Sequence, residues 1–196
     1  DPAGVGPELL VEAWHRRGEA GLAPFFAVGG AGLLAAALRQ RGIDVPIARI
    51  ADPAQAAAVF AQALPVLGLG DADGAYAPGA PDREGAALAL ASLTEATRLA
   101  VSGAASGIVT GPIAKARLAE VGFDYPGQTE FVAAGCGIAA QDAVMMLAGP
   151  SLRTVPLTVH VALSRVPVLL TAALIERRAR IVARALQRDF GLAQPR

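Results

Sequence analysis

The sequence has few of the residues that would indicate a disulfide-stabilised, membrane or nucleic-acid-binding protein. Among 196 residues there is one cysteine, Cys136, which excludes an internal disulfide and a cysteine metal cluster and fits a reducing compartment. No apolar run reaches the length of a membrane span. The 17 basic and 17 acidic residues give zero net charge, which argues against nucleic acid or an anionic membrane as a main partner. We therefore expect a cytoplasmic protein that binds neither.

Lysine and histidine are also scarce. Lys115 is the single lysine in a chain whose other basic side chains are all arginines, and His15 and His160 are the two histidines. Lys115 follows a Gly-Pro turn, where its ammonium group could bind a phosphate or carboxylate, or could simply be solvated. His160 ends an apolar run, where its ring is either a hydrogen-bonded core group or a ligand at the mouth of a strand. We interpret His15 as exposed.

What the chain has in quantity is apolar residues, 54% of the total, in runs that alternate with helical segments. Such alternation predicts a three-layer α/β/α fold with a mostly parallel sheet. We expect a first domain over residues 1–124 and the start of a second over 125–196, with an exposed loop at 70–81. The predicted strands are 25–28, 65–69, 107–110, 143–147 and 155–161. Helices are predicted over 8–17, from Gly30 to Arg41, from Asp82 to Gly103, and after Gly111, Thr129 and Thr171.

Three segments are predicted at the carboxyl ends of strands, where ligands bind in open α/β sheets. They are the opening Asp1–Glu8, the segment 110–115 and the segment 125–130. The opening glycines lead into a helix N-terminus, which suits an anion or cofactor. The same residues would also fit an ordinary turn that binds no ligand. In the third segment Gln128 and Thr129 present polar side chains, and Thr129 can cap the following helix.

The ends of the chain are unusual for this fold. The sequence starts without methionine and without a strand before its glycine turn, and it stops after a helix. We therefore expect a piece of a longer protein, whose first domain lacks its opening strand and its completion.

Several motifs occur together in one order along nearly the whole chain. They are Asp1–Glu8, Val109–Lys115, Gly127–Phe131, Met145–Leu147 and Val159–Leu163. This combination resembles the 4-hydroxythreonine-4-phosphate dehydrogenase family of pyridoxal phosphate biosynthesis, whose fold is like that of isocitrate and isopropylmalate dehydrogenases. The resemblance implies a homodimer with a shared active site, a small phosphorylated hydroxy-acid substrate, NAD or NADP, and a divalent metal such as zinc, magnesium or cobalt. It implies oxidation of an alcohol followed by loss of carbon dioxide.

The resemblance also implies roles for particular residues. His160 corresponds to a metal-binding histidine, and Gln128 and Thr129 correspond to substrate-contacting positions. Lys115 corresponds to a lysine of the family whose role we leave open, as a catalytic candidate. Other metal histidines and most NAD contacts of the family correspond to positions beyond residue 196.

Two departures from the family pattern keep alternatives open. Gln128 stands where the family has a histidine, which retains hydrogen bonding but removes a titratable proton carrier, and Ala114 replaces another frequent histidine. The alternatives are a related dehydrogenase for another phosphorylated four-carbon hydroxy acid or a dihydrodiol, and a non-catalytic binding or dimerisation module.

Overall fold

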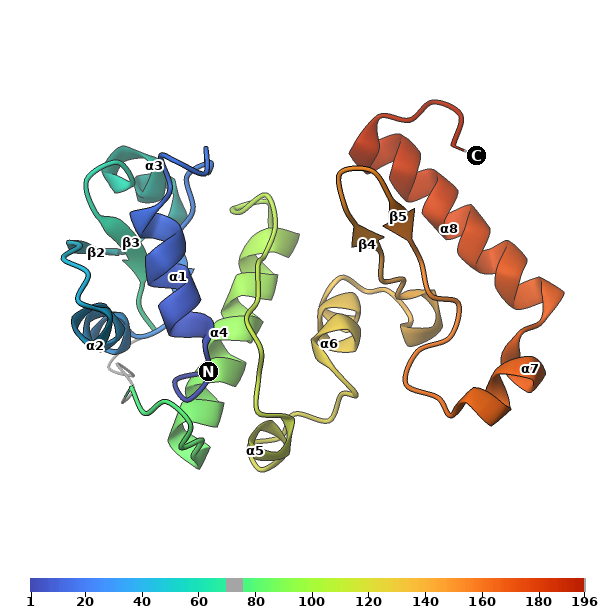
Figure 1. Cartoon of the computed structure of the whole chain (residues 1–196), viewed down its shortest axis with the longest axis horizontal. Helices are drawn as coiled ribbons and strands as arrows, with labels where there is room; N and C mark the ends of the chain where they lie inside the picture. The colour runs from blue at the N-terminus through green and yellow to red at the C-terminus, as the bar shows by residue number, and fades with distance from the viewer. Residues whose placement is uncertain (70–75, 196) are drawn as a thin grey trace. The chain divides into compact units, whose positions relative to one another are not determined.

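The fold is described from a computed structural model, which covers residues 1–69 and 76–195 (Figure 1). The chain forms two compact units, Asp1–Gly127 and Gln128–Arg196. The strands are β1 (Ala27–Val28), β2 (Ile47–Ile50), β3 (Leu64–Leu67), β4 (Leu147–Ala148) and β5 (Arg153–Thr154). The helices are α1 (Gly6–His15), α2 (Ala31–Arg41), α3 (Ala56–Val59), α4 (Arg83–Val101), α5 (Lys115–Ala119), α6 (Gln128–Gly135), α7 (Val166–Leu169) and α8 (Ala172–Phe190).

The first unit is built on a parallel sheet with the strand order β1-β3-β2. All four residues of the central strand β3 are buried, and successive side chains point to opposite faces. Val66 packs with Trp14 of α1 and Leu34 of α2, whereas Leu67 packs with Leu99 of α4. Helices therefore cover both faces of the sheet, and the predicted α/β fold with a parallel sheet is confirmed (Figure 1).

The helices with clear local end signals lie close to their predicted positions. The helix α2 ends at Gly42, whose φ of 65° is the left-handed conformation that glycine adopts most readily. The side chain of Asp82 accepts a hydrogen bond of 2.7 Å from the Gly85 amide and so caps α4. Thr171 caps α8 in the same way, through the amide of Leu174. A cap of this kind contributes about 1 kcal/mol.

Several predicted elements are wrong among the described residues. The segments 107–110 and 155–161 are not strands, 143–147 overlaps β4 only at its last residue, and β2 and α3 were not predicted. The helix expected after Gly111 starts at Lys115. An apolar run favours burial, but a strand also needs a neighbouring strand whose backbone can hydrogen-bond to its own N–H and C=O groups. No described segment pairs with 107–110 or 155–161. Of the predicted loop 70–81, residues 70–75 lie outside the described residues, and 76–81 contain no helix or strand.

The second unit consists of α6, the antiparallel pair β4–β5, α7 and the long helix α8 (Figure 1). The α8 guanidinium of Arg177 binds the Asp142 carboxylate through two bonds of 2.6 and 2.7 Å, and these hydrogen bonds, together with its charge, lower the pKa of that carboxyl. Arg153 of β5 lies 4.5 Å from the ring of Phe190. Among residues 128–195, Ala133 alone is buried. No helix in the described part of either unit has the length and apolarity needed to cross a membrane.

Candidate functional site

The opening turn is held by the carboxylate of Asp1. One carboxylate oxygen accepts a hydrogen bond from the Ala3 amide at 3.0 Å, a local turn of the kind that aspartate favours. The other oxygen accepts a hydrogen bond of 2.9 Å from the amide of Ala114, 113 residues further along the chain. A single carboxylate therefore joins the opening turn to the segment before α5. Charge-assisted bonds of this type are stronger than neutral ones.

The backbones of the same two segments lie close together where each has a glycine, at Gly6 and Gly111. A Cβ on Gly111 would lie 3.1 Å from the Cα of Gly6, tighter than side chains normally pack. Gly79 donates a backbone hydrogen bond of 2.9 Å to Ala3, and a Cβ on Gly85 of α4 would lie 3.2 Å from the Pro2 ring. The opening turn is thus enclosed by three other parts of the first unit, and glycine is required where backbones meet.

The side chain of Lys115 reaches the third predicted segment. Its ammonium donates a hydrogen bond of 2.8 Å to the carbonyl oxygen of Pro126. Within residues 1–127, hydrogen bonds connect the three predicted segments, since Asp1 and Ala114 join the first two and Lys115 joins the second to Pro126 of the third. The predicted place of the segment 110–115 at the end of a strand is wrong, because 107–110 is not a strand. Lys115 is exposed, as the solvated interpretation expects, but its ammonium also has this backbone partner.

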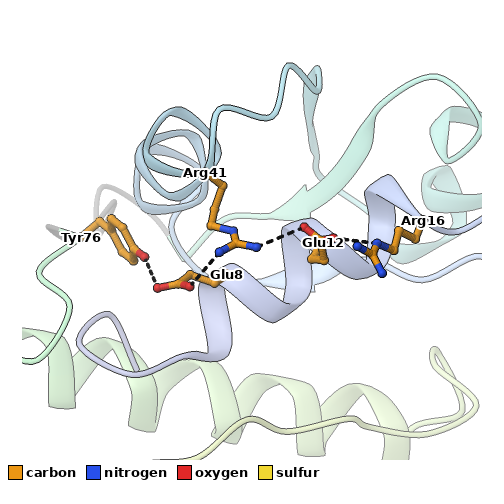
Figure 2. A network of polar contacts seen from close by, with 5 residues as sticks. All are labelled: Glu8, Glu12, Arg16, Arg41 and Tyr76. Atoms are coloured by element: carbon orange, nitrogen blue, oxygen red, sulfur yellow. Dashed lines mark hydrogen bonds and ion pairs between the residues drawn. The ribbon is translucent and has the colours of Figure 1, made fainter.

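A network of polar side chains also surrounds the first helix, and the sequence analysis missed it. Tyr76 donates a hydrogen bond of 2.8 Å to the Glu8 carboxylate. Arg41 of α2 lies between Glu8 and Glu12, at 3.9 and 3.7 Å, and Arg16 pairs with Glu12 at 2.7 Å (Figure 2). The network attaches residue 76 and α2 to the helix that follows the opening turn. The weak signal for it in the sequence is an aromatic residue in a loop of small and polar residues.

Tyr76 should titrate well above the ordinary range of a tyrosine. Loss of solvation, the hydrogen bond to Glu8 and the charge of Glu8 raise the pKa of Tyr76 to about 12 from 10.0. A raised pKa means that the protonated phenol stabilises the fold below pH 10.0, and that this contribution is lost as the pH rises towards about 12. We expect the difference in tyrosinate absorbance between the protein and its Tyr76→Phe variant to be less than half developed at pH 11. Glu8→Gln should shift this transition to lower pH, and a Tyr76 that ionises near pH 10 would contradict the network.

The remaining candidate residues lie in the second unit. Gln128 and Thr129 are the first two residues of α6, so the prediction that Thr129 caps a helix starting at Glu130 is wrong. Thr129 is exposed. His160 lies on a bend, not on a strand, and it too is exposed, so the interpretation of a core histidine is wrong. Its φ of 56° makes it the one non-glycine residue with positive φ in the described part of the chain. Such backbone strain often accompanies a functional position.

The described residues do not build a metal site by themselves. They contain no group of three or more histidine, cysteine, aspartate or glutamate side chains that could hold a metal ion. The imidazole of His160 can supply one ligand, whereas a protein metal site of the catalytic type needs about three. A shallow apolar hollow of about 440 Å³ beside α4 is lined mainly by Ala87, Leu90 and Ala91, and it includes none of the turn residues above.

Comparison with known proteins now places the chain in a family. The model of the pyridoxal phosphate biosynthetic protein PdxA family matches residues 22–196. The chain belongs to the PdxA family. It is 59% identical over its whole length to a protein of Erythrobacter litoralis named 4-hydroxythreonine-4-phosphate dehydrogenase, and it spans 58% of that relative. The predicted family resemblance is thereby confirmed.

Two solved structures show how far the likeness extends. A 4-hydroxythreonine-4-phosphate dehydrogenase from Burkholderia phymatum matches the whole chain with a TM-score of 0.86 and 28% identity, over 58% of its own length. A terephthalate 1,2-cis-dihydrodiol dehydrogenase from Burkholderia xenovorans matches with a TM-score of 0.63 and 26% identity, over 57% of its length. The PdxA chain described here therefore corresponds to a little over half of each relative.

Proposed function

We propose that the complete protein is a dehydrogenase that oxidises 4-phosphohydroxy-L-threonine in pyridoxal phosphate biosynthesis and depends on NAD and a divalent metal. The observation that carries the proposal is the 59% identity, along the whole chain, to a relative named for this activity. In the reaction, the carbon of the secondary alcohol gives a hydride to NAD⁺ and the hydroxyl gives up its proton. The resulting β-keto acid then loses carbon dioxide.

The proposal assigns roles to the residues at the start of α6 and to His160. Gln128 and Thr129 contact the substrate, with amide and hydroxyl groups that donate and accept hydrogen bonds. His160 is one ligand of the metal, and the other ligands come from parts of the complete protein outside the 196 residues. Exposure of Thr129 and His160 supports these roles, because both side chains are accessible to a ligand.

The test is an assay of NADH formation by the complete protein. We expect absorbance at 340 nm to rise with 4-phosphohydroxy-L-threonine and NAD, to stop after a chelator, and to return with zinc, magnesium or cobalt. Parallel reactions with NADP distinguish the two cofactors. An activity unaffected by exhaustive chelation would contradict the metal dependence, and no turnover with any metal would contradict the dehydrogenase.

A second candidate function is a dehydrogenase for a dihydrodiol or for another phosphorylated hydroxy acid. Gln128 in place of the family histidine favours it, because glutamine cannot carry a proton during the reaction. The structural likeness to a dihydrodiol dehydrogenase also supports it, at a lower TM-score of 0.63. If kcat/KM for a cis-dihydrodiol exceeds that for 4-phosphohydroxy-L-threonine, the second candidate replaces the first. Failure of every substrate would leave a non-catalytic binding module.

We further propose that the complete protein is a homodimer with an active site shared between subunits. Residues 128–195 expose large apolar side chains such as Leu152, Leu163 and Val168, at 67%, 86% and 70%, a surface that the rest of the complete chain or a second subunit would cover. Light scattering coupled to gel filtration should give twice the mass of one complete chain. A single-chain mass at micromolar concentration would contradict the dimer.

A further inference from the structure

Residues 114 and 115 are adjacent in the chain but are bonded to two different turns. The backbone amide of Ala114 is bound to the carboxylate of Asp1 at 2.9 Å, on the side of the opening turn. The side chain of Lys115 is bound to the carbonyl of Pro126 at 2.8 Å. The pair therefore links the opening turn to the turn that immediately precedes Gln128.

The base of the lysine side chain is itself firmly placed. Lys115 is the first residue of α5, and Leu118 of the same helix is fully buried. The carbonyl of Leu118 also accepts a hydrogen bond of 3.1 Å from the Phe123 amide, which closes the chain back towards the third turn. The ring of Phe123 then packs against that of Tyr125, with 5.7 Å between ring centroids. The turn at Pro126 is thus held at one end by aromatic packing and in its middle by the ammonium.

The contact partner matters for the role of the lysine. A carbonyl oxygen is an acceptor that cannot take a proton at ordinary pH, so the bond orients the turn and transfers no proton. An ammonium that donates to a carbonyl at 2.8 Å is also in the geometry of a charge-assisted bond, stronger than a bond between neutral groups. The contact therefore gives Lys115 a role that needs no change in its protonation.

We propose that Lys115 is a positioning residue, which fixes the turn at Pro126 and thereby the first residues of α6, Gln128 and Thr129, for contact with the substrate. The inference rests on the proposed function for the roles of Gln128 and Thr129, but the bond of Lys115 to the turn does not. It also revises the status of Lys115 as a candidate for catalysis. Lys115 acts through the backbone of another segment and does not itself touch the reacting atoms.

The test uses the complete protein and three variants. Lys115→Met removes the donor and keeps the apolar stem, and Lys115→Arg keeps a donor that cannot lose its proton. Arg117→Met is the matched control, because Arg117 is an exposed basic residue of the same helix whose partner is Glu120 at 2.8 Å. We expect Lys115→Met to raise KM for the phosphorylated substrate about tenfold, as for loss of one bond to a charged group, with kcat changed less than about threefold. Lys115→Arg should restore most of the affinity, and Arg117→Met should behave like the unaltered protein.

A second measurement tests the order of the turn at Pro126 independently of enzyme activity. Hydrogen exchange of the peptide covering residues 124–132 should be faster in Lys115→Met than in Arg117→Met or the unaltered protein. Unchanged exchange would overturn the proposal, because the bond would then not order the turn. Faster exchange with unaltered KM would overturn the link to substrate binding. If the unaltered protein shows no dehydrogenase activity, the proposed function fails, and exchange still decides whether Lys115 orders the turn.

The kinetic pattern also separates positioning from proton transfer. If Lys115 acted as a general acid or base, Lys115→Met would lower kcat about 100-fold or more, and Lys115→Arg would not restore it. The pH–rate profile of Lys115→Met would also lack one limb. That result would overturn the proposal. A Lys115→Met variant with the kinetics of Arg117→Met would do so as well.

Discussion

Replacement of His160 by asparagine should lower the metal affinity and the turnover of the complete protein by at least about 100-fold. The reason is that His160 is a direct metal ligand in the proposed function, and loss of a direct ligand costs more than loss of an outer-shell partner, which already costs about 10- to 100-fold. Asparagine is the informative substitution, because it tolerates the left-handed backbone that His160 adopts with φ 56°. The change therefore removes the imidazole with little disturbance of the bend. Titration calorimetry with zinc and the NADH assay measure the two effects.

The control for this prediction is the other histidine of the chain. His15 is exposed at the end of α1, and its replacement by asparagine removes an imidazole without touching any proposed site. We expect His15→Asn to bind metal and turn over substrate as the unaltered protein does. Equal effects of the two substitutions would show that His160 is not a ligand.

Replacement of Trp14 by alanine should lower the free energy of unfolding by about 3–5 kcal/mol, which is typical for truncation of a buried aromatic side chain. Trp14 is 4% exposed on α1, where it packs in the cluster between that helix, α2 and β3. Its indole N–H donates a hydrogen bond of 3.1 Å to the carbonyl of Phe60, and its ring meets the Phe60 ring edge-on at 6.4 Å. Alanine removes the packing and the donor together. Urea unfolding followed by circular dichroism measures the change.

Trp14→Phe separates the two contributions. Phenylalanine keeps most of the apolar contact but leaves the Phe60 carbonyl without the indole donor, so we expect a loss of about 1–3 kcal/mol. A Trp14→Ala variant that loses less than about 1 kcal/mol would mean that this cluster does not carry the stability of the first unit.

The segments of the candidate site could be predicted from the sequence, but their hydrogen-bond partners could not. The sequence drew attention to the opening octapeptide, to Lys115 because it is the only lysine, and to the turn before Gln128. It gave no partner for any of them. Asp1 bonds to a residue 113 positions away, and Glu8 to a tyrosine 68 positions away. Such pairs depend on how elements pack, and a single sequence carries no direct signal for them.

The chain itself determined the elements whose signals are local. The left-handed Gly42 ends α2, and the side-chain caps at Asp82 and Thr171 begin α4 and α8, where the pattern predicts, because a cap forms between residues a few positions apart. Only the tertiary structure decided which apolar runs became strands. The run at 64–67 lies between two parallel neighbours and is fully buried, whereas Val109 in the run at 107–110 is fully exposed and unpaired among the described segments. A strand forms only where a neighbouring strand can hydrogen-bond to its backbone, and which segments become neighbours depends on the packing of residues far apart in the chain.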